Sequence, residues 1–171
     1  MKLQIRQEIP SDYEQVERII TQAFNTAPHS DGNEARLVHD IRMGKNFIPQ
    51  LSLVALYEDE IIGHILFSKI KIGNGDGLAL APLSVLPEFQ RMGVGKSLIS
   101  AGHQIASKMG FTISVVLGDP AYYMKNGFSP AFKYGIYPPF NTDSKYYMVH
   151  PLIDGELPDG IVVYDMAFGL W

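Results

Sequence analysis

The chain has 171 residues, a formal net charge of −4 and no cysteine, so disulfide bonds, thiolate metal sites and a cysteine nucleophile are excluded. Hydrophobic residues make up 46% of the chain and charged residues 19%, as in a soluble globular protein, and no Lys/Arg cluster indicates a nucleic-acid partner. No apolar run reaches the ~18 residues of a membrane-spanning helix, and the N-terminus has no signal-peptide core. We therefore expect one intracellular, cytoplasmic domain over residues 1–171.

The N-terminal part of the chain predicts one short strand and two helices. Residues 3–5 alternate apolar and polar side chains, as a strand does. Residues 12–25 carry apolar side chains at helical intervals, behind a capping-box spacing that runs from Ser11 to Glu14. A second helix is expected over residues 33–44.

The middle of the chain predicts strands in series. Residues 51–57 and 61–72 are rich in β-branched and aromatic residues and are separated by a short polar turn, which indicates a hairpin. The glycine-rich residues 73–77 are expected to form a second turn and not a ligand cradle, because glycine and asparagine accept positive φ there. A further apolar strand follows over residues 78–85.

The C-terminal part alternates helices and strands. A long helix is expected from Val94 to Met109, and then come a strand over residues 111–117 and a short helix over residues 119–127. Residues 146–152 and 161–166 are candidate strands. The element order predicts an α/β (α+β) fold, with a mixed, mainly antiparallel sheet of about seven strands flanked by helices.

The stretch LSVLPEFQRMGVGK, residues 83–96, joins a strand to a glycine-containing loop and a helix start. Backbone N–H groups at a helix N-terminus, together with the helix dipole, bind phosphate groups, and glycine lets the ligand approach closely. A nucleotide P-loop would need glycine where Gln90 stands, and a dinucleotide loop would need glycine at Leu98. The loop therefore predicts an anion site of another kind.

This loop resembles the acyl-CoA signature of the GCN5-related N-acetyltransferase (GNAT) superfamily, [Gln/Arg]-x-x-Gly-x-[Gly/Ala], at residues 90–95. A second family signature, aromatic-Tyr-x-x-x-Gly-Phe, resembles residues 122–128, and the predicted element order is also that of the family. The segment Leu-Gly-Asp-Pro-x-Tyr-Tyr at residues 117–123 looks like that of the bacterial predicted acetyltransferases.

The resemblance implies acetyl-CoA as co-substrate, and the spacing of the histidines gives no reason to expect a catalytic metal. Backbone groups of Leu83, Ser84 and Val85 would hold the pantetheine arm, and a bulge near them would turn an N–H group toward the thioester oxygen. Asp119 and Tyr122 would add to the cofactor site, although the simplest role of Asp119 is to cap the next helix. The residues that would bind the pyrophosphate are Gln90, Arg91, Met92, Gly93, Val94, Gly95 and Lys96.

By the same resemblance, Tyr123 would be the general acid that protonates the departing CoA thiolate, since phenol and thiol have comparable basicity. The alternative is that Tyr123 only packs. For the general base, many relatives carry a glutamate in the strand after the pyrophosphate helix, but residues 111–117 contain no acidic residue. Glu34 and His64 are the remaining candidates, and a chain of water molecules without a dedicated base is a third possibility.

Other chemistries find no support in the pattern of residues. Ser84 and Ser97 lack the Gly-x-Ser-x-Gly context of a serine hydrolase. The histidines other than His64 show no metal-ligand spacing. They are His29, His39, His103 and His150.

The resemblance thus implies an N-acyltransferase, most simply one that moves acetyl to a primary amine by direct attack in a ternary complex. Two alternatives stay open: a non-catalytic acyl-CoA-binding sensor or partner module, and an acetyltransferase acting on protein N-termini or lysines instead of a small-molecule amine. Residues 134–140, aromatic and proline-rich, are a candidate wall of the acceptor site. A homodimer through the C-terminal strands is implied by the resemblance alone, and neither nucleic acid nor membrane is an expected partner.

Overall fold

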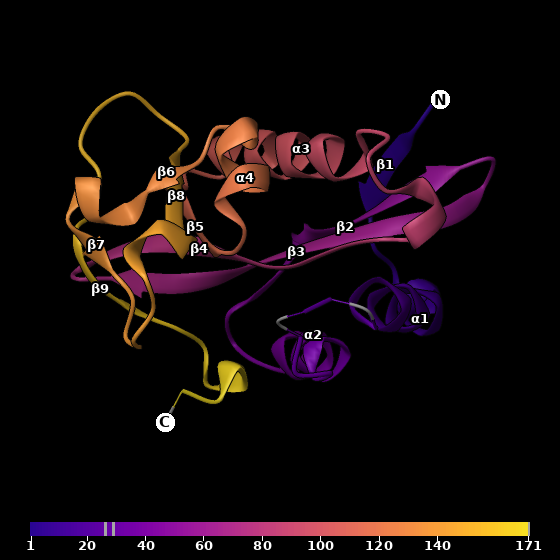
Figure 1. The fold of residues 1–171 in the computed structure, drawn as a ribbon, viewed down its shortest axis with the longest axis horizontal. Coiled ribbons are helices and arrows are strands. Elements are labelled where there is room, and N and C mark those ends of the chain that lie inside the picture. Colours follow the sequence, from indigo (N-terminus) through magenta and orange to yellow (C-terminus); the bar gives the residue numbers. More distant parts are fainter. Residues whose placement is uncertain (26, 29, 171) are drawn as a thin grey trace.

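In the computed structural model, which describes residues 1–170 apart from residues 26 and 29, nine strands form one mixed sheet. Helix α3 (Val94–Lys108) lies over one face of the sheet, and helices α1 (Tyr13–Phe24) and α2 (Glu34–Arg42) cover the other face (Figure 1). His29 lies outside the described residues. The predicted mixed, mainly antiparallel sheet flanked by helices is confirmed.

The first four strands pair antiparallel in chain order. The predicted hairpin turn has positive φ at Glu58 (49°) and Asp59 (65°), which is the backbone twist that a tight hairpin needs. The glycine-rich segment is also a turn, with Ile72 paired directly with Gly75. The four strands are β1 (Gln4–Gln7), β2 (Phe47–Tyr57), β3 (Glu60–Ile72) and β4 (Gly75–Val85).

The remaining strands extend the sheet beyond β4. Strand β5 (Ile113–Leu117) pairs parallel with β4, β8 (Tyr147–Pro151) pairs antiparallel with β5, and β9 (Gly160–Val163) returns to pair with β3. The sequence predicted about seven strands because β6 (Ser129–Pro130) and β7 (Ile136–Tyr137) have two residues each. A strand of two residues is too short to show an alternating pattern.

The helix starts differ from the prediction in one place. Ser11 does not cap α1, because the chain forms a 3-10 turn over Pro10–Asp12 and puts Ser11 inside it. The carboxylate of Asp12 instead accepts a hydrogen bond from the backbone N–H of Ile9 (2.9 Å). The last helix, α4 (Pro120–Tyr123), continues as a 3-10 turn and ends at Gly127, which has φ of 90°. The 3-10 turns are Pro10–Asp12, Pro87–Phe89, Met124–Asn126, Ala131–Tyr134, Ser144–Tyr146 and Met166–Phe168.

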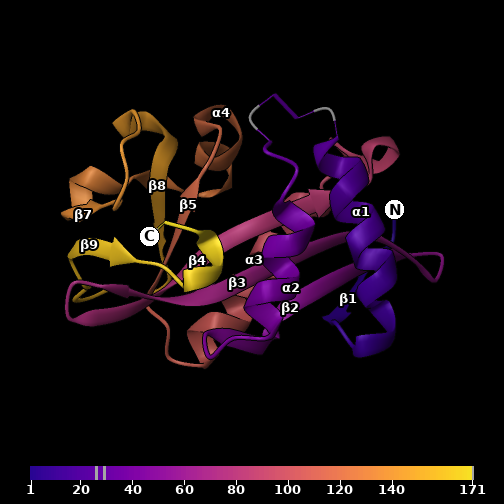
Figure 2. The same ribbon diagram turned by 90° about the horizontal axis from the view of Figure 1, so that it is seen from below.

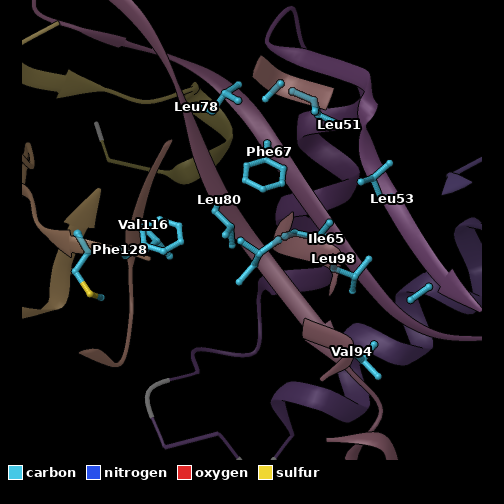
Figure 3. Close-up of a cluster of buried hydrophobic side chains, with 14 of the residues drawn as sticks. Leu51, Leu53, Ile65, Phe67, Leu78, Leu80, Val94, Leu98, Val116 and Phe128 are labelled. Atoms are coloured by element: carbon cyan, nitrogen blue, oxygen red, sulfur yellow. The ribbon is translucent and has the colours of Figure 1, made fainter. Parts of the chain in front are cut away.

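The main core lies between α3 and the sheet (Figure 3). Val94 and Leu98 of α3 and Phe67 and Leu80 of the sheet are each at most 4% exposed. Gly102 lets α3 lie close to the sheet, because a Cβ atom there would lie 2.4 Å from the Phe67 ring. Burial of such side chains stabilises the fold by about 1.5–3 kcal/mol each and fixes the position of α3 on the sheet.

The opposite face of the sheet carries a second core beneath α1 and α2, which lie side by side over β2 and β3 when seen from below (Figure 2). Ile20 of α1, Ile41 of α2 and Leu66 of β3 are almost completely buried there. Among the described residues, no helix combines the length and the apolar content needed to cross a bilayer.

Candidate active site

The sheet opens between β4 and β5. Their parallel pairing is limited to Leu78 with Ser114 and Ala79 with Val115, although β4 continues to Val85. Among the described residues, the C-terminal part of β4 therefore has a strand partner only on the β3 side. Polar backbone groups on the other side of this segment are left for a ligand to pair with.

A β-bulge marks the place where β4 leaves β5. Ile65 pairs with Leu83 and Phe67 with Leu80, so Ala81 and Pro82 together oppose a single residue of β3. The sequence predicted a bulge near Leu83, Ser84 and Val85, but it lies just before them. The reason is that Pro82 has no N–H group and cannot join the ladder, which makes it the natural position for the irregularity.

The loop that follows β4 is held in a strained conformation. Arg91 has φ of 63° and Gly93 has φ of 87°, both in the left-handed region. Gln90 fastens the loop to the strand, because its side-chain amide donates a hydrogen bond to the carbonyl of Val85 (3.1 Å). Backbone strain of this kind concentrates at ligand-binding sites.

The loop delivers the chain to the start of α3. Val94 turns its side chain into the core, and the first hydrogen bond of the helix runs from Ser97 N–H to the carbonyl of Gly93 (3.0 Å). The N–H groups between them are those that a helix leaves without an intrahelical partner. Lys96, exposed in the same turn, adds a positive charge. Together these groups are of the kind that binds an anion, and the anion site expected here stays a prediction.

Helix α4, which carries Tyr122 and Tyr123, lies against the start of α3. A Cβ atom on Gly95 would lie 2.2 Å from the Tyr122 hydroxyl and 3.4 Å from Leu83, so these two side chains close around the helix start. The Tyr122 and Tyr123 rings meet edge to face at 5.0 Å. The two family signatures, which are separated in the sequence, therefore lie in one place.

Tyr123 is packed on two sides. Its ring lies against Gly118, just after β5, and meets the Phe128 ring at 5.5 Å. Burial, and to a smaller extent the neighbouring Tyr122, raises the pKa of the Tyr123 phenol well above its ordinary value. The phenol is therefore a protonated hydrogen-bond donor throughout the neutral range.

Asp119 caps α4, as the sequence predicted. Its carboxylate accepts a hydrogen bond from the backbone N–H of Ala121 (2.9 Å). This contact occupies one oxygen of an otherwise exposed side chain and fixes the start of the short helix that carries both tyrosines.

An open pocket of about 710 Å³ continues from the loop along α3. Lys96 and Lys125 line it, and its floor includes His103 and His150, whose rings meet at 4.5 Å. His103 also hydrogen-bonds Ser114 (2.7 Å), and burial, with a smaller contribution from the neighbouring His150, lowers the pKa of His103 to about 3. Sequence reasoning missed this histidine pair, which only the fold brings together.

The two candidate general bases, Glu34 and His64, lie on separate elements, and each is engaged by other residues. Glu34 lies at the start of α2 and accepts a hydrogen bond from the Ser30 hydroxyl (2.5 Å). His64 lies in the centre of β3, is 0% exposed, and has a pKa lowered to about 3 by burial and by the nearby Arg42. Strand β5 carries no carboxylate, and no group of three acidic or histidine side chains among the described residues could hold a metal ion.

Three polar residues around His64 had no visible role in the sequence: Glu8, Arg42 and Ser52. Ser52 hydrogen-bonds both His64 (2.9 Å) and Glu8 (2.6 Å), and Arg42 forms an ion pair with Glu8. A charged residue at the end of the first strand is the only signal that could have drawn attention to Glu8.

Known proteins similar to this chain are acetyltransferases. Residues 13–128 match the Acetyltransferase (GNAT) family. The uncharacterized N-acetyltransferase YjhQ of Escherichia coli K12 is 39% identical over 124 residues, which cover 70% of this chain and 66% of YjhQ. The uncharacterized N-acetyltransferase YhbS of the same strain is 31% identical over 169 residues, which cover 96% of this chain and 97% of YhbS.

Solved structures agree. The crystal structure of Escherichia coli YhbS in complex with CoA has a TM-score of 0.89 and 28% sequence identity, and covers 99% of this chain and 93% of that one. A GNAT acetyltransferase of Brucella melitensis, solved with acetyl-CoA, has a TM-score of 0.81 and 31% identity, with 98% of each chain covered. The protein therefore belongs to the GNAT family and is an N-acetyltransferase.

Proposed function

We propose that the protein transfers the acetyl group of acetyl-CoA to a primary amine, by direct attack of the amine on the thioester within a ternary complex. The observation that carries the proposal is the meeting of three features: the opening between β4 and β5, the loop before α3, and the tyrosines of α4. The CoA and acetyl-CoA bound by YhbS and by the Brucella protein support the choice of cofactor.

In this proposal the loop residues hold the pyrophosphate through the free N–H groups of the first turn of α3. Leu83, Ser84 and Val85 offer backbone groups to the pantetheine arm and to the thioester oxygen. The nucleotide end of CoA lies toward Lys96 and Lys125, whose charges match its phosphates. No metal takes part, and residues 1–171 act as one domain.

The chemical step needs a proton on the leaving thiolate. Tyr123 supplies it in our proposal, because its ring meets that of Tyr122, whose hydroxyl lies beside the helix start, and its phenol is protonated at neutral pH. The amine nitrogen forms the new bond to the acyl carbon, the C–S bond breaks, and the proton that the amine loses passes through water and restores the phenol of Tyr123. CoA and the N-acetylated amine are the products.

The non-catalytic alternative rests on one observation, the lack of a carboxylate on β5. The test must also distinguish two kinds of acceptor. One is a small molecule, with residues 134–140 as one wall of its site, and the other is a protein N-terminus or lysine. The homodimer through the C-terminal strands stays a prediction.

Thiol release from acetyl-CoA, followed with small primary amines and with peptides that carry a free N-terminus or a lysine, tests the proposal. We expect release above the amine-free rate with at least one amine, and CoA binding in the same titration buffer. Binding without release for any amine would favour the sensor, and absence of binding at millimolar CoA would overturn both.

A further inference from the structure

A row of buried polar side chains runs from α2 across strands β2 and β3, on the face of the sheet that α2 covers. Arg42 of α2 pairs with Glu8, which follows β1, and the side chains of both are at most 9% exposed. The hydroxyl of Ser52 on β2 lies 2.6 Å from Glu8 Oε2 and 2.9 Å from Nε2 of His64 on β3. Such groups are costly to bury unless each finds a partner.

These contacts fix the tautomer of His64. The Glu8 carboxylate, ion-paired with Arg42, can only accept hydrogen bonds, so the single hydroxyl proton of Ser52 is donated to it. The oxygen of Ser52 must then accept from Nε2–H of His64. Nδ1 of His64 is therefore an unprotonated acceptor, with its lone pair pointing away from Ser52.

That acceptor is buried and has no partner among the described residues. The hydroxyl of Ser84, 1% exposed on β4, is in the same state. His64 and Ser84 are directly paired across the β3–β4 ladder, so their side chains stand on the same face of the sheet. Directly opposed residues have Cβ atoms about 4.5–5.5 Å apart, a separation that one water molecule bridges between two short polar groups.

We propose that Ser84 and Nδ1 of His64 share one buried water molecule. The resulting chain of hydrogen bonds runs from Ser84 to Arg42 and makes Ser84 and His64 positioning residues for the acyl site. The positioning role rests on the proposed function, because it concerns the segment of β4 offered there to the pantetheine arm and the thioester. The chain of hydrogen bonds itself does not depend on the proposed function.

The position of Ser84 explains why such an anchor matters. Leu83 and Val85, on either side of it, pack toward α3, whereas Ser84 faces the opposite layer. This segment has left β5 and, within the part of the chain that the structure describes, is paired only with β3, immediately after a bulge. A side-chain anchor on the face opposite α3 limits movement of backbone groups that must meet the thioester within a fraction of an ångström.

The test compares Ser84→Ala with Ser68→Ala. Ser68 is a matched control because it lies on β3, is 0% exposed and also has a hydroxyl without a partner, but it faces Ala79 and not a histidine. We expect Ser84→Ala to lower Tm by about 2–4 °C, since it removes one of the two groups that hold the shared water molecule, and Ser68→Ala to leave Tm unchanged or raised.

Long-range ¹H–¹⁵N spectra of protein labelled in histidine, with His64→Gln to assign the signals, should show the Nε2–H tautomer. The Nδ1 signal should move in Ser84→Ala and stay in Ser68→Ala. In kinetics, kcat should fall about tenfold in Ser84→Ala, with the KM for acetyl-CoA unchanged.

Equal Tm values and equal Nδ1 signals in the two alanine variants would overturn the hydrogen-bonded chain. A moved Nδ1 signal with unchanged kcat would overturn the positioning role. Because Tm and the Nδ1 signal do not depend on turnover, they decide about the chain even if no acetyl transfer is found, which is the result that would overturn the proposed function instead.

Discussion

The hydroxyl of Tyr122 occupies the space in which a side chain on Gly95 would begin, 2.2 Å from the position of its Cβ atom. The start of α3 and the helix that carries the two tyrosines therefore fit together only because position 95 is a glycine. Gly93, in the same loop, has nothing within 4 Å of its Cβ position and is required for a different reason, its φ of 87°.

This difference predicts energetic coupling between Gly95 and Tyr122. Gly95→Ala should be more favourable by about 1 kcal/mol in the Tyr122→Phe background than in the wild type, because removal of the hydroxyl leaves Leu83 at 3.4 Å as the nearest neighbour. Gly93→Ala is the matched control: it should destabilise equally in both backgrounds, since its cost is backbone strain. Urea unfolding of the six proteins measures both effects, and equal costs of Gly95→Ala in the two backgrounds would contradict the packing argument.

Tyr123→Phe should lower kcat about 10²-fold, the lower limit for loss of a general acid, and should leave CoA affinity nearly unchanged. Since the pKa of the Tyr123 phenol is raised, its titration should cause no loss of wild-type activity between pH 7 and its ordinary value of about 10. Tyr146→Phe, an exposed tyrosine whose ring faces Lys145, is the control for removal of a phenol. Steady-state kinetics and CoA titration give the two readouts, and an unchanged kcat in Tyr123→Phe would remove this residue from the mechanism.

Lys96→Ala and Lys125→Ala should each weaken CoA binding by up to about tenfold, or ~1.4 kcal/mol, because both lysines line the pocket assigned to the nucleotide end. The effect should shrink at high salt and, if Lys125 meets the 3′-phosphate, should be absent for dephospho-CoA with Lys125→Ala. Lys45→Ala, on the turn after α2, is the control for removal of an exposed positive charge. Calorimetric titration at two salt concentrations distinguishes these cases, and equal losses in all three variants would place the nucleotide elsewhere.

The parts of the site that the sequence predicted are local. The loop before α3 depends on glycine spacing and on a helix start, and both can be recognised within residues 83–96. The α4 segment likewise carries its own start signal, Asp119 followed by Pro120. Even the bulge had a local signal, since Pro82 interrupts a strand that is paired with β3.

The parts that the sequence did not predict depend on register between distant strands. Glu8 and Ser52 are 44 residues apart, and they meet His64 only because β1, β2 and β3 are aligned as they are. A shift of one residue in that alignment would turn these side chains to the other face of the sheet. His103 of α3 and His150 of β8 come together through packing of the helix on the sheet, which is equally non-local.

Asp12 offers a test of the fold that is independent of activity. Its carboxylate is 7% exposed and receives two hydrogen bonds from Arg6 (2.6 and 3.1 Å) and one from the N–H of Ile9 (2.9 Å). The hydrogen bonds from Arg6 and the one from Ile9 lower the pKa of Asp12 despite its burial. Asp12→Asn should therefore reduce the free energy of unfolding at pH 7 by about 1–3 kcal/mol.

The sign of the pH dependence follows from the lowered pKa. A carboxyl with a folded-state pKa below its unfolded value stabilises the fold fully above about pH 3.9, and this contribution is lost as the pH falls through the lower folded value. The difference between wild type and Asp12→Asn should thus be constant near neutrality and should shrink below about pH 4. Glu14→Gln is the control, because Glu14 pairs with Arg18 where both side chains are at least 67% exposed, and such pairs contribute about 0–1 kcal/mol. Urea unfolding at neutral and acid pH gives the comparison, and a cost of Asp12→Asn that is the same at both would rule out the charged carboxylate as its source.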